Sequence, residues 1–227
     1  MLSAVTTDAM PLDRRRRRRL ETIEEVLDVA VEIMTEQGVA GLSIGEVARR
    51  MGIRPPSLYV YFASKEAMYD AVFLRGARAI LAHMREHTAG VATDPRPLHD
   101  VLLDAGQAMV TWSVHHPAYT QLLFWRPVPG FTPSEQSYAP AVELVEHSRA
   151  NFVILQDRGL IRADVDVDDA LRDWTILIAG VVSQQLSNAP HESVDNGAFT
   201  SRLPNLVAMY CDHYSSPAKG NRNARKR

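Results

Sequence analysis

Apolar residues recur every three or four positions along most of this chain, which is the period of amphipathic α-helices. The first such pattern covers residues 17–37 and stops before Gly38, a residue type that often follows a helix C-terminus. No stretch alternates apolar and polar residues with a period of two, so the sequence predicts an all-α fold. The further helices are predicted at about 44–51, 65–87, 98–115, 118–125, 138–158, 167–188 and 199–214.

Prolines and glycines mark the breaks between these helices. Residues 126–137 contain three prolines and Gly130, and we expect a loop there, either a lid over a pocket or an ordinary surface connection. Pro204 lies inside the last apolar pattern, where it either kinks the helix or marks its true start.

The segment Ser43–Phe62 has the pattern of a helix-turn-helix, in which a recognition helix lies in the major groove of DNA and a second helix supports it. Ser43 and Glu46 have the spacing of a capping box, which predicts a short helix that begins after Ser43. Gly52 permits a tight turn at low conformational cost. A second helix is therefore expected to follow this turn.

Pro55 and Pro56 suit the first turn of that second helix, because its first backbone N–H groups need no partner within the helix. Leu58 and Phe62 are four residues apart and are expected to face inward. Between and beside them lie outward side chains whose hydroxyl groups suit phosphate oxygens or base edges. These side chains are Ser57, Tyr59 and Tyr61.

Residues 20–75 resemble the TetR family of bacterial regulators, through Leu58-Tyr59, Tyr61-Phe62 and the Ser64-Lys65-Glu66 start of the next helix. The resemblance implies a homodimer that binds a palindromic double-stranded DNA operator, most commonly as a repressor. It also implies a C-terminal helical domain that binds a small-molecule ligand and dimerises, with ligand binding releasing the DNA. The DNA-contacting residues that it implies are Ser43, Arg54, Pro55, Pro56, Ser57, Tyr59, Tyr61 and, on a phosphate, Lys65.

Two features of the segment limit how it reads base pairs. Gly45 stands where relatives often carry a polar or basic residue, so no side chain is present there. Pro55-Pro56 offers few hydrogen-bond donors. Direct base readout is therefore expected to be sparse.

The net charge of −2 hides a run of six arginines, Arg14–Arg19, just before the first helix. This run either releases counterions from DNA phosphates or forms part of a solvated tail. We expect a disordered basic arm at 1–16, a helix-turn-helix domain at 17–64, a ligand-binding and dimerisation domain at 65–215 and a disordered basic tail at 216–227.

Aromatic residues are frequent after the helix-turn-helix, and all three tryptophans lie there. Aromatic walls favour a pocket for a mostly apolar organic ligand, although aromatic residues at helical spacing also fill ordinary cores. The pocket hypothesis names Trp112, Tyr119, Phe124, Trp125, Phe152 and Trp174.

The helix predicted at residues 168–186 is apolar around most of its circumference, so it must be buried on more than one side. The second side is either a dimer partner or the interior of a monomer. The dimer hypothesis joins the apolar residues of this helix to those of the last helix. They are Leu171, Trp174, Ile176, Leu177, Ile178, Val181 and Val182, and Val207, Met209, Tyr210 and Tyr214.

Three other functions are weighed against DNA binding. Gly41–Gly45 matches the G-x-S-x-G pattern of α/β-hydrolases, but that chemistry needs a buried strand before it, so we predict no enzyme and no cofactor. The second alternative is a helical module that regulates without DNA, because Pro55-Pro56 offers few hydrogen-bond donors to bases.

The third alternative is a metal site. His83 and His87 lie four residues apart and are candidate ligands together with His99, His115 or His116. Histidines near a helix C-terminus are more often explained by the helix dipole, and we predict no metal.

Two observations bear on the cellular compartment. Cys211 is the single cysteine and cannot form an internal disulfide, which fits a reducing compartment. The sequence also has no apolar run of about 18 residues, the length needed to span a bilayer. Acidic residues rather than an apolar segment follow the arginine run, so we predict a cytoplasmic protein without a signal peptide or membrane contact.

Overall fold

The computed structural model describes residues 11–216 of the chain. Within them the backbone is helical except for turns and one isolated antiparallel bridge between Ile161 and Ser215, which confirms the all-α prediction. The helices are α1 (Pro11–Gln37), α2 (Ile44–Arg50), α3 (Pro55–Leu58), α4 (Lys65–His87), α5 (Leu98–His115), α6 (Pro117–Phe124), α7 (Glu135–Asp157), α8 (Val167–Asn188) and α9 (Leu203–Tyr214). None of these helices is long and apolar enough to cross a bilayer.

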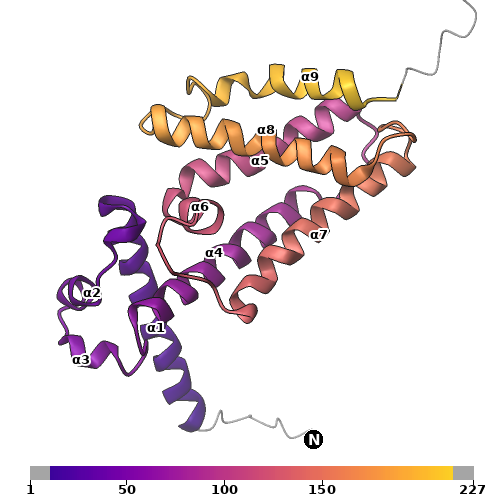
Figure 1. Ribbon diagram of the computed structural model, residues 1–227. Helices are drawn as coiled ribbons and strands as arrows, with labels where there is room; N and C mark the ends of the chain where they lie inside the picture. The colour runs from indigo at the N-terminus through magenta and orange to yellow at the C-terminus, as the bar shows by residue number, and fades with distance from the viewer. Residues whose placement is uncertain (1–10, 217–227) are drawn as a thin grey trace, which may run out of the picture.

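The molecule has two ends, and α4 runs from one to the other (Figure 1). Helices α1, α2 and α3 lie at the end where α4 begins, while α8 and α9 lie side by side at the far end with α5 behind them. The first core includes Ile33, Val47 and Leu58, and Tyr69 of α4 donates a hydrogen bond to the carbonyl oxygen of Val39 at 2.7 Å. Helix α4 is thereby fixed to the N-terminal helices.

The second core lies among α5, α7, α8 and α9. Leu155, Ile161 and Val207 are buried in it. The hydroxyl of Tyr210 in α9 donates to the carbonyl oxygen of Ala170 in α8 at 2.7 Å. These contacts make the far end a packed helical layer in which α8 and α9 are neighbours.

Three helix starts differ from the sequence predictions. Helix α1 begins at Pro11 rather than near residue 17, so residues 11–16 of the expected disordered arm are helical. Proline suits a helix start and arginine is a good helix former, and both properties favour the extension. Residues 1–10 of the arm and 217–227 of the tail lie outside the described residues.

The other two differences are at the starts of α7 and α9. Helix α7 begins at Glu135 rather than 138, because the hydroxyl of Ser134 accepts a capping hydrogen bond from the backbone N–H of Ser137 at 3.2 Å. Helix α9 begins at Leu203, so Pro204 marks the true start of that helix instead of kinking it.

The connection between α6 and α7 is tied to α4. The carboxylate of Asp70 accepts hydrogen bonds from the backbone N–H and the hydroxyl of Ser134 at 2.7 and 2.9 Å and from the hydroxyl of Ser137 at 2.7 Å. Phe131 packs against Tyr69 with ring centroids 5.5 Å apart. The segment therefore lies along the junction of the two ends.

Candidate DNA-binding surface and ligand cavities

The turn between α2 and α3 has the geometry that the sequence predicts. Gly52 has φ +67°, a conformation that favours glycine. The backbone N–H of Ile53 donates to the carbonyl oxygen of Ala48 at 3.0 Å. Leu58 and Phe62 are buried, and both Tyr61 and Phe62 donate backbone hydrogen bonds to the Leu58 carbonyl at 2.9 Å. Helix α3 itself ends at Leu58, and turns continue the chain to Phe62.

The predicted DNA-contacting side chains lie on the outer side of this unit. Tyr59 is 54% exposed beside the buried Leu58. Tyr61 and Lys65 are half-buried. The exposed members are Ser43, Arg54, Pro55, Pro56, Ser57 and Tyr59. The start of α2 and the stretch 54–59 thus present these residues to solvent.

The half-buried members already have partners within the chain. Lys65 donates to the carbonyl oxygen of Ala40 at 3.3 Å, and its ammonium lies 5.4 Å from the centre of the Tyr69 ring. Arg19 of α1 donates to the Val60 carbonyl at 3.1 Å, and its guanidinium lies 5.2 Å from the centre of the Tyr61 ring.

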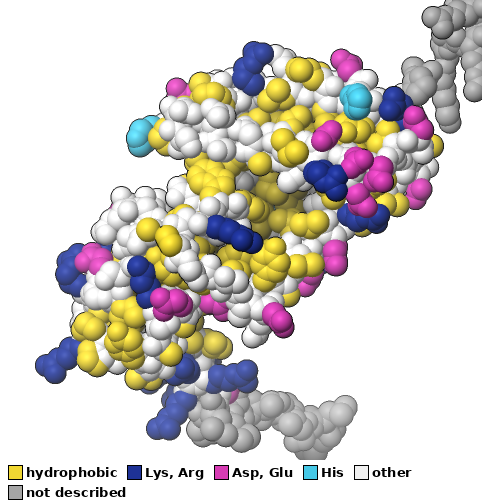
Figure 2. Space-filling view, viewed as in Figure 1, with side chains coloured by type: hydrophobic (Ala, Val, Ile, Leu, Met, Phe, Trp, Pro, Cys, Tyr) yellow, Lys and Arg dark blue, Asp and Glu magenta, His cyan; other side chains and the backbone are white. Residues whose placement is uncertain are grey.

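Arg19 was missed as an individual residue by the sequence argument. Its position at the end of the arginine run was the only signal, because nothing in the sequence shows that α1 passes beside the segment after α3. Figure 2 shows Lys and Arg side chains around the outside of this end of the molecule. The described side chains of Arg14–Arg19 are all exposed.

The capping-box prediction at Ser43 is wrong. Ser43 is the N-cap of α2, but its side chain makes no capping hydrogen bond. Glu46 instead accepts from Arg49 at 2.8 and 2.7 Å and from Arg50 at 2.9 Å. These hydrogen bonds lower the pKa of Glu46 to about 2. Arg50 also bonds Glu36 of α1 at 3.0 Å, which ties α2 to α1.

A cavity of about 130 Å³ lies at the far end of the molecule, among α4, α5, α6, α7 and α8. Three predicted ligand residues line it, namely Phe124, Trp125 and Trp174. Figure 2 shows a hollow with hydrophobic walls between α8 and α7. The other lining residues include Met109, Leu171, Ile178 and Val182. The cavity is therefore mostly apolar.

A second cavity of about 90 Å³ adjoins the first and is lined by the predicted residues Phe152 and Trp174. Its walls are more polar and include Thr88, His147 and Asn151. No residue between 126 and 134 lines either cavity. The connection between α6 and α7 is thus not a lid over them.

Trp112 and Tyr119 line neither cavity. Trp112 is buried in a cluster with Ile80 and Leu144, and Tyr119 accepts a hydrogen bond from Nε of Arg75 at 2.7 Å. Both were chosen because they are aromatic, but composition does not show which face of a helix turns toward a cavity.

The helix predicted to be buried on two sides is α8. Within the single chain Val181 is only 4% exposed, and Val207, Tyr210 and Tyr214 of α9 are also buried. They therefore belong to the core of the chain. The large apolar side chains that remain exposed on α8 and α9 are Ile176, 64% exposed, and Met209, 68% exposed.

The two histidines of the metal hypothesis are explained by protein contacts. Nε2 of His83 lies 3.1 Å from the carbonyl oxygen of Ala108, and Nδ1 of His87 lies 2.8 Å from the carbonyl oxygen of His83. Within residues 11–216 no group of three or more His, Cys, Asp or Glu side chains is arranged to hold a metal ion. A helix and a short 3-10 turn, not a strand, precede Ser43.

Comparison with known proteins agrees with this geometry. The sequence profile of the "Bacterial regulatory proteins, tetR family" matches residues 26–72. The Bacillus subtilis (strain 168) "Uncharacterized HTH-type transcriptional regulator YobS" is 26% identical over 98 residues, which are 43% of this chain and 49% of that protein. The Escherichia coli "Tetracycline repressor protein class A from transposon 1721" is 36% identical over 69 residues, 30% of each chain. The chain therefore matches half or less of these relatives' lengths.

The fold extends the likeness beyond the matched segment. A TetR family transcription regulator from Marinobacter aquaeolei VT8 superposes with a TM-score of 0.62 at 16% identity, over 89% of this chain and 100% of that one. At this identity the match concerns the fold alone. The matched segment covers α2, α3 and the adjoining parts of α1 and α4. Through this segment, which is carried on a fold of the same type, the chain matches the sequence profile of the TetR family of bacterial regulators.

Proposed function

We propose that this protein is a repressor that binds a palindromic operator as a homodimer and is released by a small, mostly apolar organic ligand. The observation that carries the proposal is the pairing of an exposed α2–α3 surface with an apolar cavity at the other end of the same molecule. The name of the tetracycline repressor supports the repressor role.

The DNA contact in this proposal is made by the start of α3 and the turn that follows it. Arg54 supplies charge, and Ser57 and Tyr59 supply hydroxyl groups to phosphates or base edges. The two prolines have no N–H to donate. Operator choice therefore depends on few direct base contacts and more on DNA shape.

Dimerisation in this proposal uses the outer face of α8 and α9. Ile176 and Met209 are large apolar side chains on adjacent helices, and both are mostly exposed in the single chain. Pairing two copies across this face removes both side chains from water. It also sets two copies of α3 at a fixed spacing, as a palindromic operator requires.

A ligand signal has a direct route from the cavity to α1. Phe124 at the end of α6 lines the cavity, and Tyr119 on the same helix accepts the hydrogen bond from Arg75 of α4. Arg75 in turn bonds Asp28 of α1 at 2.7 Å and Glu24 at 3.2 Å. A ligand that shifts α6 would thus alter the contact that holds α1.

Selection of bound sequences from a random DNA library tests the proposal. We expect enrichment of a site with two symmetric halves, and gel-shift titration should then give one dimer per site. Enrichment of no sequence, with no binding to the DNA beside the protein's own gene, would favour a helical module that regulates without DNA.

A further inference from the structure

The two cavities have common walls. Met84, Ala105, Ser148 and Trp174, from α4, α5, α7 and α8, line both of them. We infer that the cavities are two parts of one site for an uncharged amphipathic molecule, whose apolar body lies in the larger cavity and whose hydroxyl-bearing end lies in the smaller one. The inference rests on the proposed ligand-binding function and names the chemical class of the ligand.

The larger cavity excludes charge. No ionisable side chain lines it, and the hydroxyl groups of Thr120, Ser148 and Thr175 already donate to backbone carbonyl oxygens. Thr120 donates to the Ser113 carbonyl at 2.8 Å, Ser148 to Leu144 at 2.9 Å and Thr175 to Leu171 at 2.8 Å. A charged ligand group would lose its hydration there without gaining a partner of opposite charge.

One part of the smaller cavity's wall consists of uncharged hydrogen-bonding groups, those of Thr88, His147 and Asn151. The hydroxyl of Thr88 donates to the Met84 carbonyl at 2.7 Å, so its oxygen accepts from Asn151 at 3.1 Å and lies 2.7 Å from Nε2 of His147. Burial, with the nearby positive charge of Arg85, lowers the pKa of His147, which favours a neutral imidazole. No described residue donates to the side-chain oxygen of Asn151, so this oxygen is an acceptor for a ligand hydroxyl.

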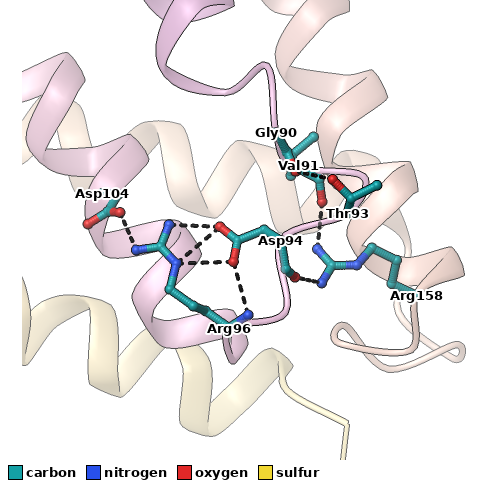
Figure 3. A network of polar contacts seen from close by, with 7 residues as sticks. All are labelled: Gly90, Val91, Thr93, Asp94, Arg96, Asp104 and Arg158. Atoms are coloured by element: carbon teal, nitrogen blue, oxygen red, sulfur yellow. Dashed lines mark hydrogen bonds and ion pairs between the residues drawn. The ribbon is translucent and has the colours of Figure 1, made fainter.

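Asp94, Arg96 and Asp104 also line the smaller cavity, and Figure 3 shows that Arg96 is paired with both carboxylates. Arg96 donates to Asp94 at 2.7 Å and to Asp104 at 2.5 Å. Arg158 donates to the carbonyl oxygens of Val91 and Asp94. An anionic or cationic ligand end would have to break one of these contacts to gain a charged partner. The contacts therefore favour a neutral polar group over a charged one.

Three probes with one alkyl chain separate the possible ligand classes, namely 1-octanol, octanoate and octylammonium. Binding is followed by tryptophan fluorescence, since Trp125 and Trp174 line the site. We expect 1-octanol to bind at least about tenfold more tightly than either charged probe. A preference for either charged probe, equal affinity for all three, or binding of none overturns the inference.

Variants test the two-part site. Ala105→Phe places a ring between the two cavities and should weaken 1-octanol binding at least tenfold, whereas Asn151→Leu should reduce the preference for 1-octanol over octanoate. Asn188→Leu, at the exposed end of α8, is the matched control and should change neither. Thermal melts establish that each variant is folded. An unchanged 1-octanol affinity in folded Ala105→Phe contradicts the shared site.

The DNA experiment keeps the two proposals apart. A protein that prefers 1-octanol but selects no DNA sequence contradicts the proposed function and leaves the ligand class standing. A protein that selects a symmetric operator but prefers a charged probe contradicts only the ligand class.

Discussion

Leu58 and Tyr59 are chain neighbours with opposite surroundings, since one is buried and the other is 54% exposed. We expect Tyr59→Ala to weaken operator binding by more than about 1 kcal/mol and to leave the melting temperature nearly unchanged, because the lost side chain supports little of the core. DNA titration and a thermal melt on the same sample measure both effects.

Tyr138→Ala is the matched control for this substitution. Tyr138 of α7 is 49% exposed but lies outside the helix-turn-helix. It should leave operator affinity unchanged. Equal losses of affinity in both variants, or unchanged affinity in Tyr59→Ala, would rule out a contact by Tyr59.

Glu46 gives the helix-turn-helix a pH dependence. The hydrogen bonds from Arg49 and Arg50 lower its pKa to about 2 from an ordinary 4.5. A carboxyl group with a lowered pKa in the folded state stabilises the fold above its unfolded-state pKa, and this contribution is lost as the pH falls toward the folded value. Glu46→Gln should therefore melt below the parent at pH 7, with a difference that shrinks between pH 4.5 and about 2.

Glu86→Gln on the exposed face of α4 is the control for this experiment. Its melting temperature should follow that of the parent protein throughout the titration. A difference between parent and Glu46→Gln that stays constant with pH would contradict the role of the carboxylate charge.

Helix α1 changes how the arginine run is able to meet DNA. An extended arm fits the minor groove, which is about 6 Å wide, but a helix with its side chains is about 10 Å across. Arg14–Arg19 lie on a helix, so we expect them to contact phosphates from outside the groove. Such contacts strengthen binding to all sequences alike.

Replacing Arg14, Arg15 and Arg16 by glutamine tests these contacts. Each phosphate neutralised contributes roughly −0.9 to the slope of log affinity against log salt, so the loss of two contacts per protomer should flatten the slope of a dimer by about 3 to 4. The control replaces three exposed arginines outside the proposed dimer seam, namely Arg78, Arg85 and Arg149. Equal slopes for parent and variant would show that the run is merely solvated.

The sequence predicted the bounds of helices more reliably than it predicted which side chains line a cavity. Apolar spacing placed α5 at 98–115 and α8 at 167–188, the bounds found in the structure. It failed at the start of α1, where charged residues carry no apolar pattern. It also failed for Trp112 and Tyr119, because period shows that a residue is on an inward face but not whether that face meets a cavity or a neighbouring helix.

The assembly of two chains is the first property of the whole molecule to test. Val181 is a poor probe because it is buried within one protomer, whereas Ile176 is exposed. We expect Ile176→Asp to convert a dimer into monomers, measured by light scattering, because the carboxylate would be buried at the seam. Val145→Asp on α7 is the control, since Val145 is 60% exposed and lies outside the proposed seam. If Val145→Asp dissociates the dimer and Ile176→Asp does not, the interface includes α7 and not the proposed seam.

Arg75 joins α1 to α6, because it bonds Asp28 of α1 and Tyr119 of α6 from its place in α4. Tyr119→Phe removes one hydrogen bond to a partly buried guanidinium and should lower the free energy of unfolding by about 1 to 2 kcal/mol. Tyr138→Phe should have almost no effect in the same urea titration, since Tyr138 is exposed. Equal free energies of unfolding for Tyr119→Phe and the parent would show that this hydrogen bond does not stabilise the fold.

If the contacts of Arg75 couple the cavity to the DNA-binding helices, the coupling acts from the DNA to the cavity as well. If a ligand at the cavity lowers operator affinity by some factor, thermodynamic linkage requires that bound operator lower ligand affinity by the same factor. The concentration of ligand needed for release is then fixed by the DNA as well as by the cavity. A promoter with a stronger operator would therefore respond at a higher ligand concentration, and one protein would set different thresholds for different genes.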